Sequence, residues 1–344
     1  MSNKKVSIIT ATFNCVSKNQ KTFFYEMFRS IHEQDYPNIE HIIIDGGSKD
    51  GSVEFIQGLI KKYGKKEVVF ISGKDRGIND ATNKGYLKSS GDYITLMCDD
   101  DFYTRPYAVS TLVKTLEDND ADYSCADSWW LNKKCWGNDI DSFVYRHPFL
   151  INAFLFKREL ISEPPYYLDE KYPMVADFDL FMRILSREDL KGASTDEILT
   201  ILRPNGFSQS NNSQYADDVT KIYKKFFNSK IFTDKELLKL HYNRVNLFTY
   251  WKILLVCKNK NIMNSLKKRY NFTYVRRRFM LKVEYYLFFK FLYAPFRFRI
   301  KNKKKSSKYS NILSRQWIET FYDDLYSVEG VFVKNLSHKI AVEH

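Results

Sequence analysis

Cysteine is scarce in this 344-residue chain, and the few that occur follow no metal-binding pattern. The five cysteines stand at positions 15, 98, 125, 135 and 257, and no two of them form a Cys-x-x-Cys pair. This spacing predicts no structural zinc site. It also favours a reducing compartment such as the cytoplasm.

Long apolar runs are missing as well. The start, Met1–Lys5, leads into an apolar segment of about six residues, which is too short for the core of a signal peptide. Two longer apolar patches, Tyr242–Cys257 and Arg276–Ala294, are interrupted by charged side chains at 252, 282, 284 and 290. Since a bilayer span needs roughly 18 or more continuous apolar residues, the sequence predicts neither a signal peptide nor a transmembrane helix.

Negative charge is nearly absent from one part of the chain. Between Lys221 and Lys308 there are 25 basic and 3 acidic side chains, a net charge of +22. The whole chain carries +13, so the remainder carries −9. This asymmetry predicts a polyanionic partner for the basic region alone.

The first 110 residues alternate between short apolar runs typical of strands and amphipathic stretches typical of helices. The predicted strands are Lys5–Thr10, Glu40–Asp45, Glu67–Ser72 and Ile94–Met97, and the predicted helices are 18–34, 52–62 and 78–87. This order predicts an α/β fold with a mostly parallel, Rossmann-like sheet flanked by helices. Ligands of such sheets bind at the carboxyl ends of the strands.

Three consecutive carboxylates, Asp99, Asp100 and Asp101, follow the strand predicted at Ile94–Met97. Like charges this close repel one another, so a divalent cation is a natural partner. Oxygen-only ligands favour Mg²⁺ or Mn²⁺ over zinc. A solvated acidic turn is the alternative interpretation. Asp45 ends another predicted strand and is therefore expected at the same edge of the sheet.

Four motifs, in this order along the chain, resemble the signatures of family 2 glycosyltransferases. They are Val6–Asn14, Ser30–Ser52, Gly77–Gly85 and Asp99–Asp101, within a resemblance that covers roughly residues 4–210. The third motif is common in the branch that builds bacterial O-antigens and capsules. The resemblance implies a GT-A domain over residues 1–215, followed by a helical, basic and aromatic region over residues 216–344.

The resemblance also implies a nucleotide-sugar donor, with UDP-sugars favoured, and a Mn²⁺ or Mg²⁺ ion. The implied metal ligand is Asp100, with Asp101 and His147 as further candidates. Cys98 stands where relatives often carry an acid or Asn, and a thiol is a poor ligand for Mg²⁺ or Mn²⁺. The implied donor-binding residues are Thr12, Phe13, Asp45, Asp80, Lys84 and Asp99.

Purely structural roles are open alternatives for several of these side chains. Asp45 suits a turn or a helix cap before the glycines that follow it. Asp80 and Lys84 lie four residues apart on a predicted helix and suit an ordinary surface ion pair. His147 suits a phosphate contact or a metal ligand, and equally a position at the edge of the core.

An inverting transferase needs a base that takes the proton of the acceptor hydroxyl. The segment Met174–Arg183 resembles the acceptor-side acidic motif of the family, and this resemblance implies Asp177 as the base. Ala176 replaces the Glu that often precedes it. Helix capping is the alternative role for Asp177, while Asp179 is expected to point elsewhere.

Aromatic and basic residues alternate in Arg276–Tyr293, and more basic residues follow. This pattern predicts a helix in the headgroup region of an anionic membrane surface. Packing on the body and homo-oligomer contacts are alternatives, and no nucleic acid is expected because no binding motif for it occurs.

The predicted function is that of a metal-dependent inverting hexosyltransferase. It would move one sugar from a nucleotide-sugar to a lipid-linked glycan or surface-polysaccharide acceptor. It would be peripheral on the inner, cytoplasmic face of the bacterial cell membrane. The alternatives are a sugar nucleotidyltransferase and a non-catalytic, membrane-bound assembly subunit. The second of these is suggested by Cys98 and Ala176.

Overall fold

A computed structural model describes residues 3–269 of the chain. The gaps are residues 19, 131–133, 137–139, 141–142, 145–147, 162–166, 204–211, 228–230, 243–248, 250–251, 254 and 256. The chain divides into two compact units, residues 1–287 and 288–344, and every described residue belongs to the first. The predictions for His147 and for the membrane-binding segment Arg276–Tyr293 lie outside the described residues.

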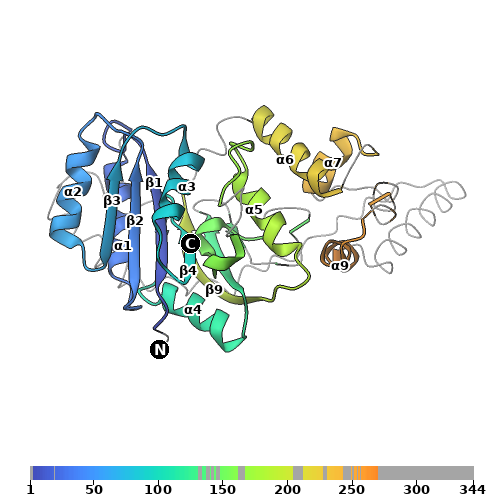
Figure 1. Ribbon diagram of the computed structural model, residues 1–344, viewed down its shortest axis with the longest axis horizontal. Coiled ribbons are helices and arrows are strands. Elements are labelled where there is room, and N and C mark those ends of the chain that lie inside the picture. Colours follow the sequence, from blue (N-terminus) through green and yellow to red (C-terminus); the bar gives the residue numbers. More distant parts are fainter. Residues whose placement is uncertain are drawn as a thin grey trace, which may run out of the picture. The chain divides into compact units, whose positions relative to one another are not determined.

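Strands and helices alternate in the first part of the chain (Figure 1). The strands are β1 (Val6–Thr12), β2 (Ile39–Asp45), β3 (Glu67–Ser72) and β4 (Tyr93–Leu96), and the helices are α1 (Lys21–His32), α2 (Ser52–Tyr63) and α3 (Ile78–Lys88). The strands pair in parallel in the order β3-β2-β1-β4. The predicted elements are all present, with ends shifted by three residues at most. The predicted helix-flanked α/β sheet is confirmed.

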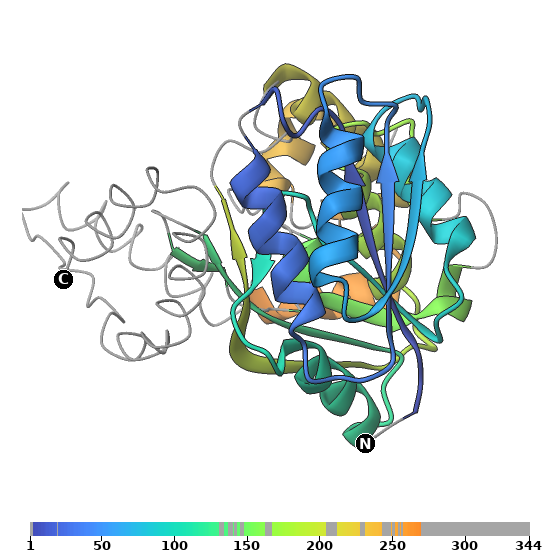
Figure 2. The same cartoon turned by 90° about the vertical axis from the view of Figure 1, so that its left-hand side faces the viewer.

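Helices cover both faces of this parallel sheet, with α1 and α2 on the face turned to the viewer in Figure 2. On that face Thr10 of β1 donates a hydrogen bond to the Met27 sulfur of α1 at 3.8 Å. On the opposite face α3 approaches β1 very closely. A Cβ atom at Gly85 would come within 2.5 Å of the Ile9 side chain, so only glycine permits this approach.

The second part of the chain continues the same sheet with mixed strand directions. Its elements are β5 (Phe102–Tyr103), α4 (Ala108–Asp118), β6 (Tyr123–Trp130), β7 (Lys134–Trp136), η2 (Ile151–Ala153), β8 (Phe154–Lys157), η3 (Arg158–Ile161), α5 (Ala176–Leu185), β9 (Gly192–Leu202), α6 (Asn212–Phe227), α7 (Asp234–His241) and α9 (Lys260–Arg269). The strand order continues β4-β8-β6-β9-β5, with β7 beside β6. β8 runs antiparallel to both β4 and β6, whereas β6 and β9 are parallel. In the described chain the sheet is therefore parallel across β3-β2-β1-β4 and mixed beyond β4, where β6 and β9 are the parallel pair.

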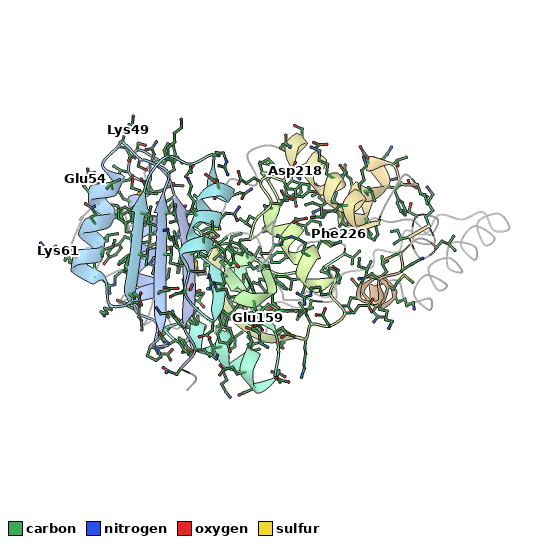
Figure 3. All side chains as sticks on the ribbon, viewed as in Figure 1. Lys49, Glu54, Lys61, Glu159, Asp218 and Phe226 are labelled. Atoms are coloured by element: carbon green, nitrogen blue, oxygen red, sulfur yellow. The ribbon has the colours of Figure 1, made fainter. Side chains whose placement is uncertain are left out.

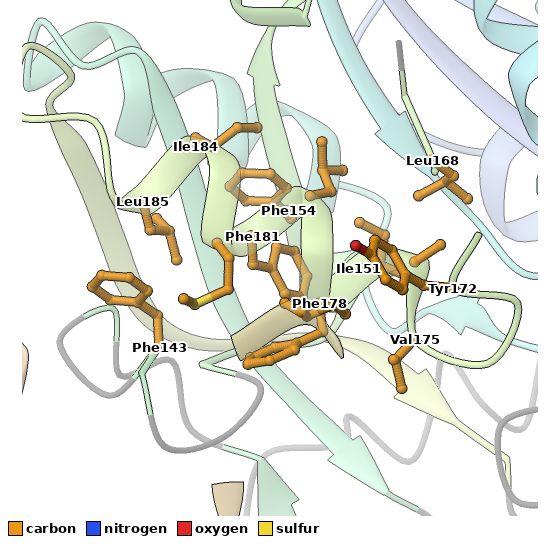
Figure 4. Close-up of a cluster of buried hydrophobic side chains, with 14 of the residues drawn as sticks. Phe143, Ile151, Phe154, Leu168, Tyr172, Val175, Phe178, Phe181, Ile184 and Leu185 are labelled. Atoms are coloured by element: carbon orange, nitrogen blue, oxygen red, sulfur yellow. The ribbon is translucent and has the colours of Figure 1, made fainter. Parts of the chain in front are cut away.

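Aromatic packing holds α5 in place (Figure 4). The Phe181 ring of α5 contacts the rings of Phe149 and Phe154, with centroids 4.7 and 5.5 Å apart. Helix α6, which carries Asp218 and Phe226 in Figure 3, packs against α5 from the other side. The start of α5 is thus fixed by the core. Of the helices in the described part of the chain, none is long and apolar enough to cross a bilayer.

Candidate active site

The carboxyl ends of β1, β2 and β4 meet at one edge of the sheet, where Lys49 lies in Figure 3. Thr12 and Asp45 are register partners at the ends of β1 and β2. The Thr12 hydroxyl donates a hydrogen bond to Asp99, which follows β4, at 2.7 Å. The structure therefore brings together three of the residues that the sequence predicted for donor binding.

The three consecutive carboxylates differ in what they contact. Asp101 is buried and accepts hydrogen bonds from the backbone N–H of Arg203 at 2.9 Å and from the Asn152 amide at 3.2 Å. Asp99 accepts from Thr12. For Asp100, the described chain supplies no partner to the carboxylate beyond its own backbone N–H. Asp100 is thus the carboxylate best placed to accept a cation. A metal role for Asp101 stays a prediction, since its contacts give it a structural task.

Burial and crowding make these acids hard to ionise. Burial, with the charge of Asp100 next in size, raises the pKa of Asp99 to about 6. Burial likewise raises the pKa of Asp100, and it raises the pKa of Asp101 well above the usual range. A nearby cation would reverse this effect because it favours the charged forms.

A cation at this position would rely on few protein ligands. Among the described residues, no group of three His, Cys, Asp or Glu side chains converges on one metal position. Mg²⁺ is commonly held by one or two carboxylates together with water and the phosphates of a substrate. Asp100, with Asp99 beside it, fits that pattern.

Cys98 is a neutral thiol at this edge. Burial raises its pKa well above the usual value, and the charges of Asp99–Asp101 and of Asp177 raise it further. A protonated thiol is a poor ligand for Mg²⁺ or Mn²⁺. The charge of Asp177, at the start of α5, is among those that act on this thiol.

Two acids in the first turn of α5 have different surroundings. Asp177 is half-buried, and its carboxylate accepts a hydrogen bond from the N–H of Phe178 at 2.9 Å. Asp179 is fully buried between the Arg183 Nε and the Lys225 Nζ, each 2.7 Å away. Each oxygen of Asp179 therefore has a cationic partner. Asp177 is therefore the more accessible of the two carboxylates.

Asp45 organises the turn that follows β2. Its Oδ2 accepts hydrogen bonds from the N–H groups of Gly47 and Ser48 at 3.1 and 3.0 Å and from the Ser72 hydroxyl at 2.6 Å. The Ser48 hydroxyl donates to its other oxygen. These contacts match the turn role that the sequence left open. A nucleotide contact by Asp45 stays a prediction, and it would have to replace one of these donors.

Asp80 and Lys84 form the ion pair that the sequence left open as an alternative. The Lys84 Nζ lies 3.1 Å from Asp80 Oδ2, and the Arg76 guanidinium lies 2.7 Å from Asp80 Oδ1. Contact of either residue with the donor stays a prediction. Phe13, just beyond β1, is 47% exposed and presents its ring at the same edge. An exposed ring there is suited to stacking against a planar ligand.

Two residues near the site, Asn83 and Arg203, make polar contacts that were not predicted from the sequence. The Asn83 side chain of α3 pairs with the backbone of Leu168, donating to its oxygen and accepting from its nitrogen, both at 2.8 Å. This contact ties α3 to the segment that leads into α5. Arg203, at the end of β9, makes a second set of contacts with Asp100, Asp101 and Glu26. Asn83 lies within the third sequence motif, Gly77–Gly85, which assigned it no role, and Arg203 belongs to none of the motifs.

Comparison with known proteins agrees with this geometry. A sequence model described as glycosyl transferase family 2 matches residues 7–190. An uncharacterized glycosyltransferase of Haemophilus influenzae is 37% identical over 97 residues, which is 28% of this chain and 36% of that protein. An uncharacterized glycosyltransferase of Mycobacterium tuberculosis is 26% identical over 206 residues, covering 57% of this chain and 71% of that protein.

A relative with a more specific name is the GalNAc(5)-diNAcBac-PP-undecaprenol beta-1,3-glucosyltransferase of Campylobacter jejuni. It is 29% identical over 110 residues, which is 32% of this chain and 34% of that protein. The match therefore spans about a third of each chain.

Solved structures share the fold. Staphylococcus aureus TarS in complex with UDP-GlcNAc superimposes with a TM-score of 0.55 at 13% identity, over 77% of this chain and 80% of that one. A mannosyltransferase of Pyrobaculum calidifontis in complex with GDP-Man and Mn²⁺ gives 0.54 at 15% identity, over 77% and 73%. The expected GT-A fold is confirmed.

Proposed function

Because the chain belongs to glycosyl transferase family 2, we propose that it moves a single sugar from a nucleotide-sugar to an acceptor hydroxyl with inversion at the anomeric carbon. The observation that carries this proposal is the placement of Asp177. It is a half-buried carboxylate in the first turn of a helix that packs into the aromatic core, and its charge acts on Cys98, the residue next to the three carboxylates.

Asp177 serves as the base in this reaction. The acceptor oxygen attacks the anomeric carbon as the bond from that carbon to the donor phosphate breaks, and the departing nucleoside diphosphate keeps the electron pair. Asp177 takes the hydroxyl proton during the attack. Asp179 is unsuited to this role, because Arg183 and Lys225 already bind its oxygens.

Asp100, with Asp99, would hold Mn²⁺ or Mg²⁺ in the working enzyme. When bound, the cation neutralises charge on the leaving diphosphate. Thr12 orients Asp99 through its hydroxyl, and Phe13 offers a surface for the base of the nucleotide. A UDP-sugar is the favoured donor, a choice supported by the UDP-GlcNAc bound to the structural neighbour TarS.

The acceptor that we propose is a lipid-linked glycan of an O-antigen or capsule pathway. The support is the name of the Campylobacter jejuni relative, which acts on an undecaprenol-linked glycan. We further propose that the enzyme is peripheral on the inner face of the bacterial cell membrane, through the +22 segment between Lys221 and Lys308.

One assay tests the catalytic proposal. The purified chain is incubated with UDP-, GDP- and dTDP-sugars in Mn²⁺, and released nucleoside diphosphate is measured with and without EDTA. We expect slow hydrolysis of one donor class that EDTA abolishes. Absence of hydrolysis and of any nucleotide-induced thermal shift would favour the non-catalytic assembly subunit. Release of pyrophosphate from a nucleoside triphosphate and a sugar phosphate would favour a nucleotidyltransferase.

A vesicle assay tests the membrane proposal. We expect the chain to sediment with anionic vesicles and to be partly released as salt rises, because salt screens the charges but leaves apolar contacts. A folded variant with reversed charge at 276, 277, 278, 303, 304 and 305 should sediment less. Equal sedimentation of the variant and the parent would argue for oligomer contacts in this region instead.

A further inference from the structure

A buried ion pair lies directly behind the three carboxylates. The Arg203 guanidinium, 7% exposed, donates to the carboxylate of Glu26 in α1, which is 3% exposed. The planar guanidinium also contacts the Phe23 and Phe102 rings, with centroids 4.3 and 4.8 Å away. The Arg203 side chain is therefore held by three residues, two on α1 and one on β5, that are distant from it in the sequence.

Arg203 makes two contacts with the carboxylate run, one to the backbone of Asp100 and one to the side chain of Asp101. Its guanidinium donates to the carbonyl oxygen of Asp100, and its own N–H donates to the carboxylate of Asp101 at 2.9 Å. The contact at Asp100 is to the backbone carbonyl oxygen, so Arg203 does not bind the carboxylate oxygens of Asp100. Arg203 thus determines where the Asp100 carboxylate lies.

Glu26 balances the charge of Arg203. An arginine this close to three carboxylates would otherwise act as their counter-ion and compete with a metal for them. With Glu26 as its partner, the guanidinium is already neutralised at hydrogen-bond distance. The charge of the three carboxylates is then left for a cation.

We propose that Arg203 and Glu26 form a charge-balanced clamp that positions Asp100 for a divalent cation without neutralising it. Both are positioning residues, since neither is placed to touch the substrate. The inference rests on the proposed function, because it concerns the same metal position.

The test measures Mn²⁺ affinity of the full chain from the EPR signal of free Mn²⁺, independently of turnover. We expect Glu26→Gln to weaken Mn²⁺ binding by about tenfold or more, as changes to residues that support metal ligands commonly do. Arg203→Lys keeps the charge but loses the forked geometry, and it should weaken binding similarly. Because Glu26→Gln leaves an uncompensated buried cation, Arg203→Lys is the fallback if that variant does not fold.

Glu40→Gln is the matched control. Glu40 is an equally buried carboxylate, bonded to Ser7, Ser90 and Gly91 at the opposite ends of the strands. The Glu40→Gln variant should lose thermal stability and keep the Mn²⁺ affinity of the parent. If Glu26→Gln and Arg203→Lys behave in the same way as this control, the pair is structural only and the inference is overturned.

A double variant, Glu26→Gln with Arg203→Gln, tests the charge balance. It removes both charges, so it should bind Mn²⁺ more tightly than Glu26→Gln alone. Equal weakness in the two variants would overturn the charge-balance argument. If the parent itself neither binds Mn²⁺ nor hydrolyses any donor, it is the proposed function that fails. If the parent is active with Mn²⁺ and the variants bind Mn²⁺ as tightly as the parent does, only the clamp is rejected.

Discussion

The two parts of the sheet hold their acidic side chains in different ways. In the parallel part, Asp45 is bound mainly by the turn that follows it, with Ser72 of β3 as a further donor, and Asp80 is bound by Lys84 on the same helix. In the mixed part, Asp101 is held by Arg203, and Asp179 is held by Lys225 of another helix in addition to Arg183 of its own. Contacts between residues close in the sequence can be predicted from a short motif. Contacts between distant segments form only on folding, so no short motif predicts them.

The largest effect that we expect comes from Asp100, where the two parts of the sheet meet. Asp100→Ala removes the carboxylate best placed for a cation, so turnover and the Mn²⁺-dependent part of nucleotide binding should both be lost. Thermal unfolding should change little because this carboxylate supports few contacts. Asp92→Ala, an exposed acid paired with Lys4 at the opposite edge, serves as the control and should keep full turnover. Full activity of Asp100→Ala, or of the parent in EDTA, would disprove the metal site.

A comparison of Asp177 with Asp179 gives the next largest effect. Asp177→Asn keeps the shape but cannot accept a proton, and kcat should fall by about 10²-fold or more with little change in donor affinity. Asp179→Asn should instead leave Arg183 and Lys225 without their buried counter-charge and lower the free energy of unfolding by about 3 kcal/mol. Steady-state kinetics and urea unfolding separate the two. Normal turnover in Asp177→Asn would move the base elsewhere.

The sequence predicted the parallel part of the fold closely and the mixed part only in outline. Apolar runs mark β1, β2 and β4 because each of these strands is buried on both faces, whereas the apolar run of β3 lies in a strand that is only partly buried. The family motifs also pointed to the residues that meet at the carboxyl edge, such as Thr12 and Asp99. The sequence could not reveal that Arg203 binds Glu26, since 177 positions separate them and no local period links them.

Asn83 allows a smaller test, because it joins the two parts. Asn83→Ala removes both hydrogen bonds to Leu168 and loosens the segment before Asp177. A misplaced base should lower kcat for sugar transfer by about tenfold to a hundredfold while donor binding is retained. Asn79→Ala is the control, as its contact with the carbonyl of Pro173 is long, at 3.4 Å. Equal kcat values for the two variants would show that the segment is held by other contacts.

A chain of hydrogen bonds between two buried histidines lies beneath the parallel part of the sheet. The backbone N–H groups of Lys65 and Lys66 donate to His32 Nδ1 at 3.1 and 3.0 Å. The other nitrogen of His32 lies 3.3 Å from His41 Nδ1, and His41 Nε2 lies 3.1 Å from the Thr10 hydroxyl. A proton on His32 Nδ1 would face two N–H groups, so this arrangement requires a neutral ring.

The last prediction is a loss of stability in acid caused by this pair. Burial, followed by the charges of Lys66 and Lys65, lowers the pKa of His32 from 6.5 to about 3, and burial lowers that of His41 well below 6.5. Below pH 6.5 these two histidines therefore bind protons in the unfolded chain but stay neutral in the folded chain. Stability should fall as pH drops from 6.5 toward 3, by up to about 1.4 kcal/mol per pH unit for each histidine. Asp99, whose raised pKa is about 6, acts in the opposite direction between pH 6 and its usual value of 3.8.

The comparison must therefore be made between variants. In urea unfolding from pH 7.5 to 4.5, His32→Gln with His41→Gln should flatten the slope. Phe28→Leu, at a ring stacked on His32, should lower stability equally at every pH. Parallel curves for the parent and the double histidine variant would exclude the pair as the source of acid sensitivity.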